Sequence, residues 1–203
     1  MAIHTTTLWQ LITDLYSPEK VAALRVVAQD TPFDYDALVD FDRQFDGPSI
    51  GTLSENGHGR YAVVDRDVFR PLQYCAMYLG AEASIREWTA HETVHMAGLH
   101  LESLIKRVGR VGPLPLGGAL RHVLVRPKLD PVLWQQLVAF SKVYNAAKHD
   151  VDQEMDTHLF SVEDAVLAYC ICRRLAISLY AQAGLMTDLS NFASTPDCLF
   201  EHL

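Results

Sequence analysis

The longest stretch of helical periodicity constrains the fold of this chain most. Between residues 81 and 108, apolar side chains recur every three or four positions, which is the spacing of one helix face. That face comprises Val94, Ala97, Leu101, Leu104, Ile105 and Val108. A long amphipathic helix must bury its apolar stripe against other elements. We therefore expect a central helix from Ala81 to Val108 in a protein of packed helices.

Other segments show the same period and predict further helices at Thr5–Tyr16, Pro18–Gln29, Phe33–Phe45, Val68–Gly80, Pro131–Lys148 and Ser161–Ala183. Glycine and proline in 46–59 and 109–118 predict loops, and 60–64 is compatible with a short strand. The expected fold class is all-α: an up-and-down helical bundle over residues 67–203, preceded by an N-terminal helical extension over residues 1–66.

The composition indicates a globular protein, since 49% of the residues are hydrophobic and 21% are charged. No apolar run reaches the roughly 18 residues of a membrane span, so we expect no membrane partner. The N-terminus lacks a basic segment followed by an apolar one, which predicts a cytoplasmic protein rather than a secreted one. The four cysteines fit this interpretation as reduced thiols.

Charge is distributed unevenly along the chain. The net charge of −8 argues against general coating of nucleic acid. Residues 103–129 contain no acid but six bases, whereas residues 30–46 contain six aspartates and one arginine. The basic stretch is compatible with a local phosphate-binding surface. It is equally compatible with a solvated face or with a partner for the acidic segment.

A zinc-hydrolase signature lies within the long predicted helix. His91 and His95 stand one turn apart, and Glu92 between them has the position of a general base for metal-bound water. The usual third ligand is missing: Gly98 is in place, but His100 comes one residue too early. The alternative to a zinc site is a polar, hydrogen-bonded margin of the bundle, in which Glu102 joins the two histidines.

A second cluster closes the helix that begins at Pro131. Asn145 and His149 share one helix face, Lys142 points the same way, and Lys148 flanks the histidine. A histidine at a helix C-terminus tends to keep its proton, because the helix dipole favours the cation. Such a group can relay a proton at a ribose phosphate while lysine neutralises charge and asparagine orients the scissile group. The alternative is a merely polar helix end.

The C-terminal half resembles a HEPN domain, a helical family of ribonucleases, toxins and RNA-binding modules. The resembling pieces are His100–Lys106, the helix ending Tyr144-Asn145-Ala146-Ala147-Lys148-His149-Asp150, and Phe160–Val166 leading into Arg173-Arg174-Leu175. In this family the active motif is an arginine, often followed by a polar residue, and then a histidine, with four to six residues between the arginine and the histidine. Asn145 and His149 match the last two places, whereas Lys142, Val143 and Tyr144 occupy the positions open to the arginine.

The resemblance implies a metal-independent RNA-binding protein or endoribonuclease without a cofactor, in a toxin, stress or defence setting. His149 would be the general acid or base, Asn145 the orienting group, and Lys142 and Lys148 the phosphate contacts. Family members usually form homodimers, and we expect one here. Two alternatives stay open: a zinc-dependent hydrolase using His91, Glu92 and His95, and a non-catalytic dimeric interaction module.

Overall fold

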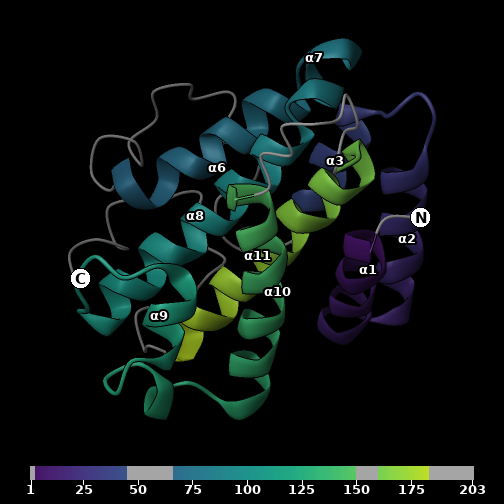
Figure 1. Ribbon diagram of the computed structural model, residues 1–203. Coiled ribbons are helices and arrows are strands. Elements are labelled where there is room, and N and C mark those ends of the chain that lie inside the picture. The colour runs from purple at the N-terminus through teal and green to yellow at the C-terminus, as the bar shows by residue number, and fades with distance from the viewer. Residues whose placement is uncertain (1–2, 45–65, 150–159, 183–203) are drawn as a thin grey trace.

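The computed structural model describes residues 3–44, 66–149 and 160–182, and all regular elements in these ranges are helical. The all-α fold class is therefore confirmed (Figure 1). The elements are α1 (Ile3–Leu15), α2 (Pro18–Gln29), α3 (Tyr35–Asp42), α6 (Arg66–Leu79), α7 (Ala83–Trp88), α8 (Ala90–Gly109), α9 (Leu116–Arg121), the 3₁₀ turn η1 (Arg126–Lys128), α10 (Pro131–His149) and α11 (Val162–Gln182).

Helix α8 is the central element of the bundle. It packs most extensively against α6 and α11, and it also contacts α9 and α10. The stripe predicted from the sequence is the buried one, since Val94, Ala97, Leu101, Leu104 and Ile105 are all inaccessible to solvent. The side chain of Val108 lies outside the described part of the chain. These four helices cover the apolar stripe of α8, which explains why α8 lies at the centre of the bundle.

The predicted helix from Ala81 to Val108 is in fact two helices, α7 and α8, separated at Thr89. The Thr89 hydroxyl and its backbone N–H both donate to the carbonyl of Ile85, at 2.8 and 2.9 Å. Threonine hydroxyls compete in this way with the regular helix pattern. A second difference lies in the segment expected to be a loop, where α9 forms a short helix after Pro115.

Two long helices begin at the predicted capping residues. The Asp130 carboxylate accepts hydrogen bonds from the backbone N–H groups of Val132 and Leu133, which satisfies the first turn of α10. Before α11, Ser161 and Asp164 cap each other: the Asp164 carboxylate accepts from the backbone and hydroxyl of Ser161, and the Ser161 hydroxyl accepts from the N–H of Asp164. These caps set the starting points of both helices.

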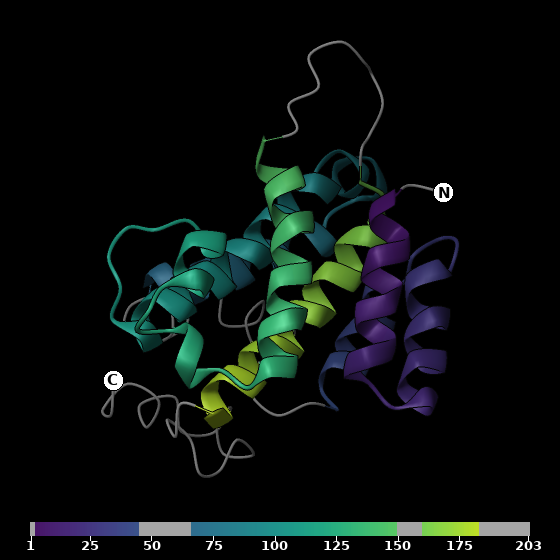
Figure 2. The same ribbon diagram turned by 60° about the horizontal axis from the view of Figure 1, so that its bottom comes forward.

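The N-terminal helices pack on the rest of the bundle. Helix α1 lies along α11 and α10, and α2 lies outside α1 and contacts α11 and α3 (Figure 2). One hydrophobic core continues from α1, α2 and α3 into the other helices. A buried ion pair of 2.9 Å joins Asp42, the last residue of α3, to Arg173 of α11. The domain boundary predicted near residue 66 adjoins residues 45–65, which lie outside the described ranges.

Three cysteines, Cys75, Cys170 and Cys172, are free and buried, as expected of reduced thiols. Cys198 and the strand considered at 60–64 fall outside the described residues. Among the helices that the structure describes, none is both long and apolar enough to cross a membrane.

Candidate functional site

Helix α10 presents three of the four predicted site residues on its outer side. Lys142, Asn145 and Lys148 are exposed, whereas Tyr144 and Ala147 between them are buried. This separation follows from the helical period, which turns positions 142, 145 and 148 away from the core. The fourth residue, His149, is the last residue of α10, and its side chain lies outside the described part of the structure.

Tyr144 anchors this side of α10 to the bundle. Its ring is fully buried, and its hydroxyl donates a hydrogen bond of 3.1 Å to Oε2 of Glu102 on α8. Burial first, and the negative charge of Glu102 next, raise the pKa of Tyr144, so the hydroxyl stays protonated and remains a donor. The ring lies directly over Gly98, where a methyl group would overlap it.

Glu102 accepts the hydrogen bond of Tyr144 together with two others. Its carboxylate is only 5% exposed and accepts from the Nζ of Lys106 at 2.6 Å and from the backbone N–H of Leu116 at 2.9 Å, besides Tyr144. Burial acts to raise the pKa of Glu102, but these three hydrogen bonds and the charge of Lys106 outweigh it and lower the pKa. The carboxylate therefore stays ionised and holds α8, α9 and α10 together.

The two motifs of the sequence meet at the Tyr144 ring. The imidazole of His95 stacks on it with ring centroids 5.8 Å apart, and the ammonium of Lys148 lies 5.6 Å from its centroid. The first contact comes from α8 and the second from α10 itself. We call the exposed side of α10 that carries Lys142, Asn145 and Lys148, together with His95 of α8, the α8–α10 face. From the sequence, the two motifs are alternative candidate sites. In the structure, one residue of each motif, His95 and Lys148, contacts the same ring.

The zinc-like motif has a different internal geometry from a zinc centre. Glu92 contacts both imidazoles directly, its Oε1 lying 3.2 Å from Nε2 of His91 and its Oε2 3.5 Å from Nδ1 of His95. Within the described residues, no three His, Cys, Asp or Glu side chains gather closely enough to hold a metal ion. Another class of zinc hydrolases takes its third ligand from a glutamate on a downstream helix, but Glu163 of α11 accepts hydrogen bonds from Trp9 and Gln29.

The basic residues of the stretch 103–129 differ in what they contact. Lys106 is paired with Glu102, and the guanidinium of Arg126 lies 4.3 Å from the ring centroid of Trp134, whereas Arg121 and Lys128 are exposed. The acidic segment forms contacts of its own, because Asp42 pairs with Arg173 and Asp40 pairs with Arg43. The basic residues thus divide between solvated positions and local partners.

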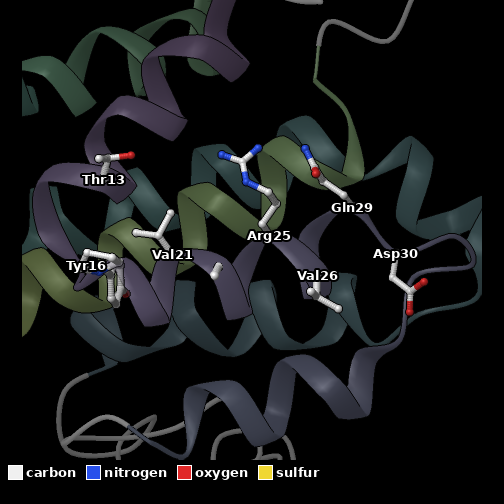
Figure 3. Close-up of a pocket in the computed structure, with 9 residues that line it drawn as sticks. Thr13, Tyr16, Val21, Arg25, Val26, Gln29 and Asp30 are labelled. Atoms are coloured by element: carbon white, nitrogen blue, oxygen red, sulfur yellow. The ribbon is translucent and has the colours of Figure 1, made fainter.

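A shallow groove of about 660 Å³ runs along α2 and the end of α1 (Figure 3). Its lining residues are Thr13, Tyr16, Pro18, Val21, Ala22, Arg25, Val26, Gln29 and Asp30. Two of its polar groups are engaged elsewhere: Arg25 lies over the ring of Trp9, and Gln29 donates to Glu163. The groove contains none of the predicted site residues, so the α8–α10 face remains the candidate site.

Comparison with known proteins adds no family to these observations. No protein-family model matches the chain, and neither the curated proteins nor the solved structures contain a match.

Proposed function

We propose that the protein binds RNA at the α8–α10 face and cleaves it without a metal ion. His149 is the proton-transfer group, Asn145 orients the scissile phosphate, and Lys142 and Lys148 neutralise its charge. The proposal depends chiefly on one observation: three polar residues of α10 are exposed on one side of a helix that Tyr144 holds in place. The partial resemblance of the C-terminal half to the HEPN family supports the same assignment.

The chemistry needs only groups that this face offers. In metal-independent cleavage the ribose 2′-oxygen attacks the adjacent phosphorus, its proton passes to a base, and the bond from phosphorus to the 5′-oxygen breaks. An acid then protonates the departing 5′-oxygen, which leaves a cyclic phosphate on one product. A positioned histidine accelerates such proton transfers by roughly 10²–10⁴-fold. A nearby ammonium stabilises the charge that develops on the phosphoryl oxygens.

Because the arginine of the family motif is missing, the lysines are the candidates for the phosphate contact. Lys148 lies against the Tyr144 ring, which supports its stem and limits its freedom, and Lys142 is exposed two turns earlier on α10. An ammonium group acts as a point charge, without the two-pronged hydrogen bonding of a guanidinium. The phosphate contact at this face is therefore electrostatic, and RNA binding weakens as salt is added.

The test is cleavage of RNA oligonucleotides by the purified protein with and without a chelator. We expect cleavage in both conditions, and no stoichiometric zinc by elemental analysis. His149→Ala should lower the cleavage rate by about 10²-fold or more. Its unfolding free energy should change by no more than about 0.5 kcal/mol, because His149 is the last residue of α10 and the helical period places it on the polar side.

His91→Ala is the matched control, because it removes an imidazole that contacts Glu92 and is 48% exposed. It should leave RNA cleavage close to wild type, whereas a zinc hydrolase would lose its ion and its activity. A stable His149→Ala protein that binds and cleaves RNA as the wild type does contradicts the proposal. Absence of any RNA binding or cleavage by the wild-type protein would leave the interaction module as the better interpretation.

A further inference from the structure

Helix α6 carries three residues that share one face and contact each other. Arg70, Tyr74 and Tyr78 follow at intervals of four positions, which places them one above the other. The rings of Tyr74 and Tyr78 stack with centroids 6.1 Å apart and planes inclined by 18°. The guanidinium carbon of Arg70 lies 5.5 Å from the Tyr74 centroid, and its Nε donates to the Tyr74 hydroxyl at 3.4 Å. We call this set the tyrosine ridge.

The tyrosine ridge lies at the margin of the core and not inside it. All three of its side chains are partly exposed, whereas Leu72 and Cys75 on the inner side of α6 are fully buried. Met77, also on α6, is 62% exposed. The ridge therefore offers aromatic surface to an incoming molecule, and burial alone does not account for two stacked tyrosines at this position.

The ridge lies on α6, the helix that packs most extensively against α8. Burial, and after it the negative charge of Glu92, raise the pKa of Tyr78, which reflects the approach of Tyr78 to the first turns of α8. Glu92 in turn contacts His91 and His95, and His95 stacks on Tyr144. Helices α6 and α8 pack extensively against each other (Figure 1). The ridge and the α8–α10 face therefore lie on neighbouring helices.

We propose that the tyrosine ridge is a base-stacking surface for an RNA strand whose phosphate is held at the α8–α10 face. This inference rests on the proposed function and adds a binding surface on α6 to it. Nucleobases stack on protein aromatic rings in a largely sequence-tolerant way, and arginine contributes cationic contacts to the same surface. Only unpaired bases can lie flat on a tyrosine ring, so the strand is single at the ridge.

Glu92 restricts how the strand runs. It is 41% exposed and would repel a phosphate passing over it. The bases, which carry no charge, therefore face the ridge, and the sugar-phosphate chain lies towards Arg70 at one end and Lys148 at the other.

The experiment measures binding of a single-stranded RNA made with 2′-O-methyl riboses, which cannot be cleaved through the 2′-oxygen. Tyr74→Ala and Tyr78→Ala should each weaken binding by at least about five-fold, the lower end of what one stacked base contributes. Tyr74→Phe keeps the ring and should bind nearly as the wild type does. Met77→Ala is the matched control on the same helix, since it shortens an exposed side chain without removing a ring.

Abasic nucleotides make the test specific for stacking. An oligonucleotide with one base removed at each position in turn should contain a position at which the Tyr74→Ala and base-removal effects are not additive. A merely structural tyrosine would give additive effects at every position. Each variant's melting temperature is measured alongside, and Tyr74→Phe keeps the result interpretable if an alanine variant does not fold.

The outcomes separate this inference from the proposed function. If the wild-type protein binds and cleaves RNA but the tyrosine variants bind it equally well, the ridge is not a binding surface and the proposed function stands. If the wild-type protein binds no RNA, both are wrong. If tyrosine removal weakens binding of duplex RNA as much as that of a single strand, base stacking is not the cause.

Discussion

Gly98 and Tyr144 form the closest packing contact beneath the candidate site. The absence of a side chain at Gly98 lets the Tyr144 ring lie directly on the backbone of α8. This places the Tyr144 hydroxyl within 3.1 Å of Glu102 and leaves the ring in contact with His95 and Lys148. Glycine in the middle of a helix normally costs stability, so its position here has a packing reason.

Gly98→Ala should therefore destabilise the protein although alanine is the better helix former. An added methyl overlaps Cβ, Cγ and Cδ2 of Tyr144, and overpacking of this kind costs typically about 1–3 kcal/mol. Gly117→Ala in α9 is the matched control, because its nearest neighbour is the flexible end of Arg121 at 3.7 Å. That control should be neutral or slightly stabilising in chemical denaturation. Equal effects of the two substitutions would show that Tyr144 moves aside freely.

Sequence periodicity predicts exposure better than it predicts polar contacts at this scale. It placed Lys142, Asn145 and Lys148 outside the core, and they are exposed. It also placed Glu102 on a polar margin beside His91 and His95, whereas Glu102 is 5% exposed. Two of its donors, the Leu116 N–H and the Tyr144 hydroxyl, come from α9 and α10, so no local pattern could reveal them. The tyrosine ridge was missed, although its spacing of four residues on α6 was visible.

Helix α9 shows why a short element can escape prediction from sequence. The segment 109–118 carries Pro113, Pro115 and four glycines, which usually indicate a loop. The N-cap position is held by Pro115, whose side chain makes no capping hydrogen bond. The acceptor for the first helical N–H, that of Leu116, is instead the carboxylate of Glu102, fourteen residues earlier on α8. A cap supplied by another helix leaves no local signature.

The acid dependence of stability tests the role of Glu102 in joining α8, α9 and α10. Its pKa in the folded protein is lower than its ordinary value of 4.5. The ionised carboxylate therefore stabilises the fold above pH 4.5, and this contribution is lost as the pH falls through the lower folded pKa. Glu102→Gln should cost roughly 1–3 kcal/mol at neutral pH, the usual cost of losing a hydrogen bond to a charged group.

The difference in unfolding free energy between wild type and Glu102→Gln should shrink as the pH falls below 4.5, measured by urea denaturation at several pH values. Glu87→Gln on α7 is the control, because Glu87 is exposed. It should change stability by no more than about 0.5 kcal/mol at any pH. A difference in unfolding free energy between wild type and Glu102→Gln that does not depend on pH would contradict the conclusion that Glu102 is ionised in the folded protein.

At the scale of the whole molecule, the all-α fold class follows from the sequence, but the contacts between distant helices do not. Long apolar stripes dictate packed helices, and the core joins α1, α2 and α3 to the other helices. The buried contact of Asp42 with Arg173 also crosses from α3 to α11, over 131 positions of sequence. Contacts between residues so distant in the chain depend on the completed fold, and periodicity within one helix cannot reveal them.

Exposed acidic and exposed basic side chains of the described residues lie in different parts of the molecule. Asp36 and Asp40 are exposed on α3, whereas Arg121 is exposed on α9 and Lys128 in η1. Helices α3 and α9 lie well apart in the molecule (Figure 1). In a two-fold dimer, the acidic end of one copy can face the basic end of the other, and the symmetry repeats that contact. This arrangement favours the symmetric homodimer expected from the sequence.

We predict a dimer in low salt that weakens as salt is added, because attraction between exposed charges is screened within about 10 Å at 0.1 M salt and about 3 Å at 1 M. The double variant Arg121→Glu with Lys128→Glu, and separately Asp36→Lys with Asp40→Lys, should each be monomeric by light scattering. An equimolar mixture of the two should recover the mass of a dimer, because reversing both ends restores every opposite pair. Arg174→Glu, at an exposed position on α11, is the control and should stay dimeric. A wild-type monomer at high micromolar concentration in low salt would contradict the prediction, as would a mixture that fails to associate.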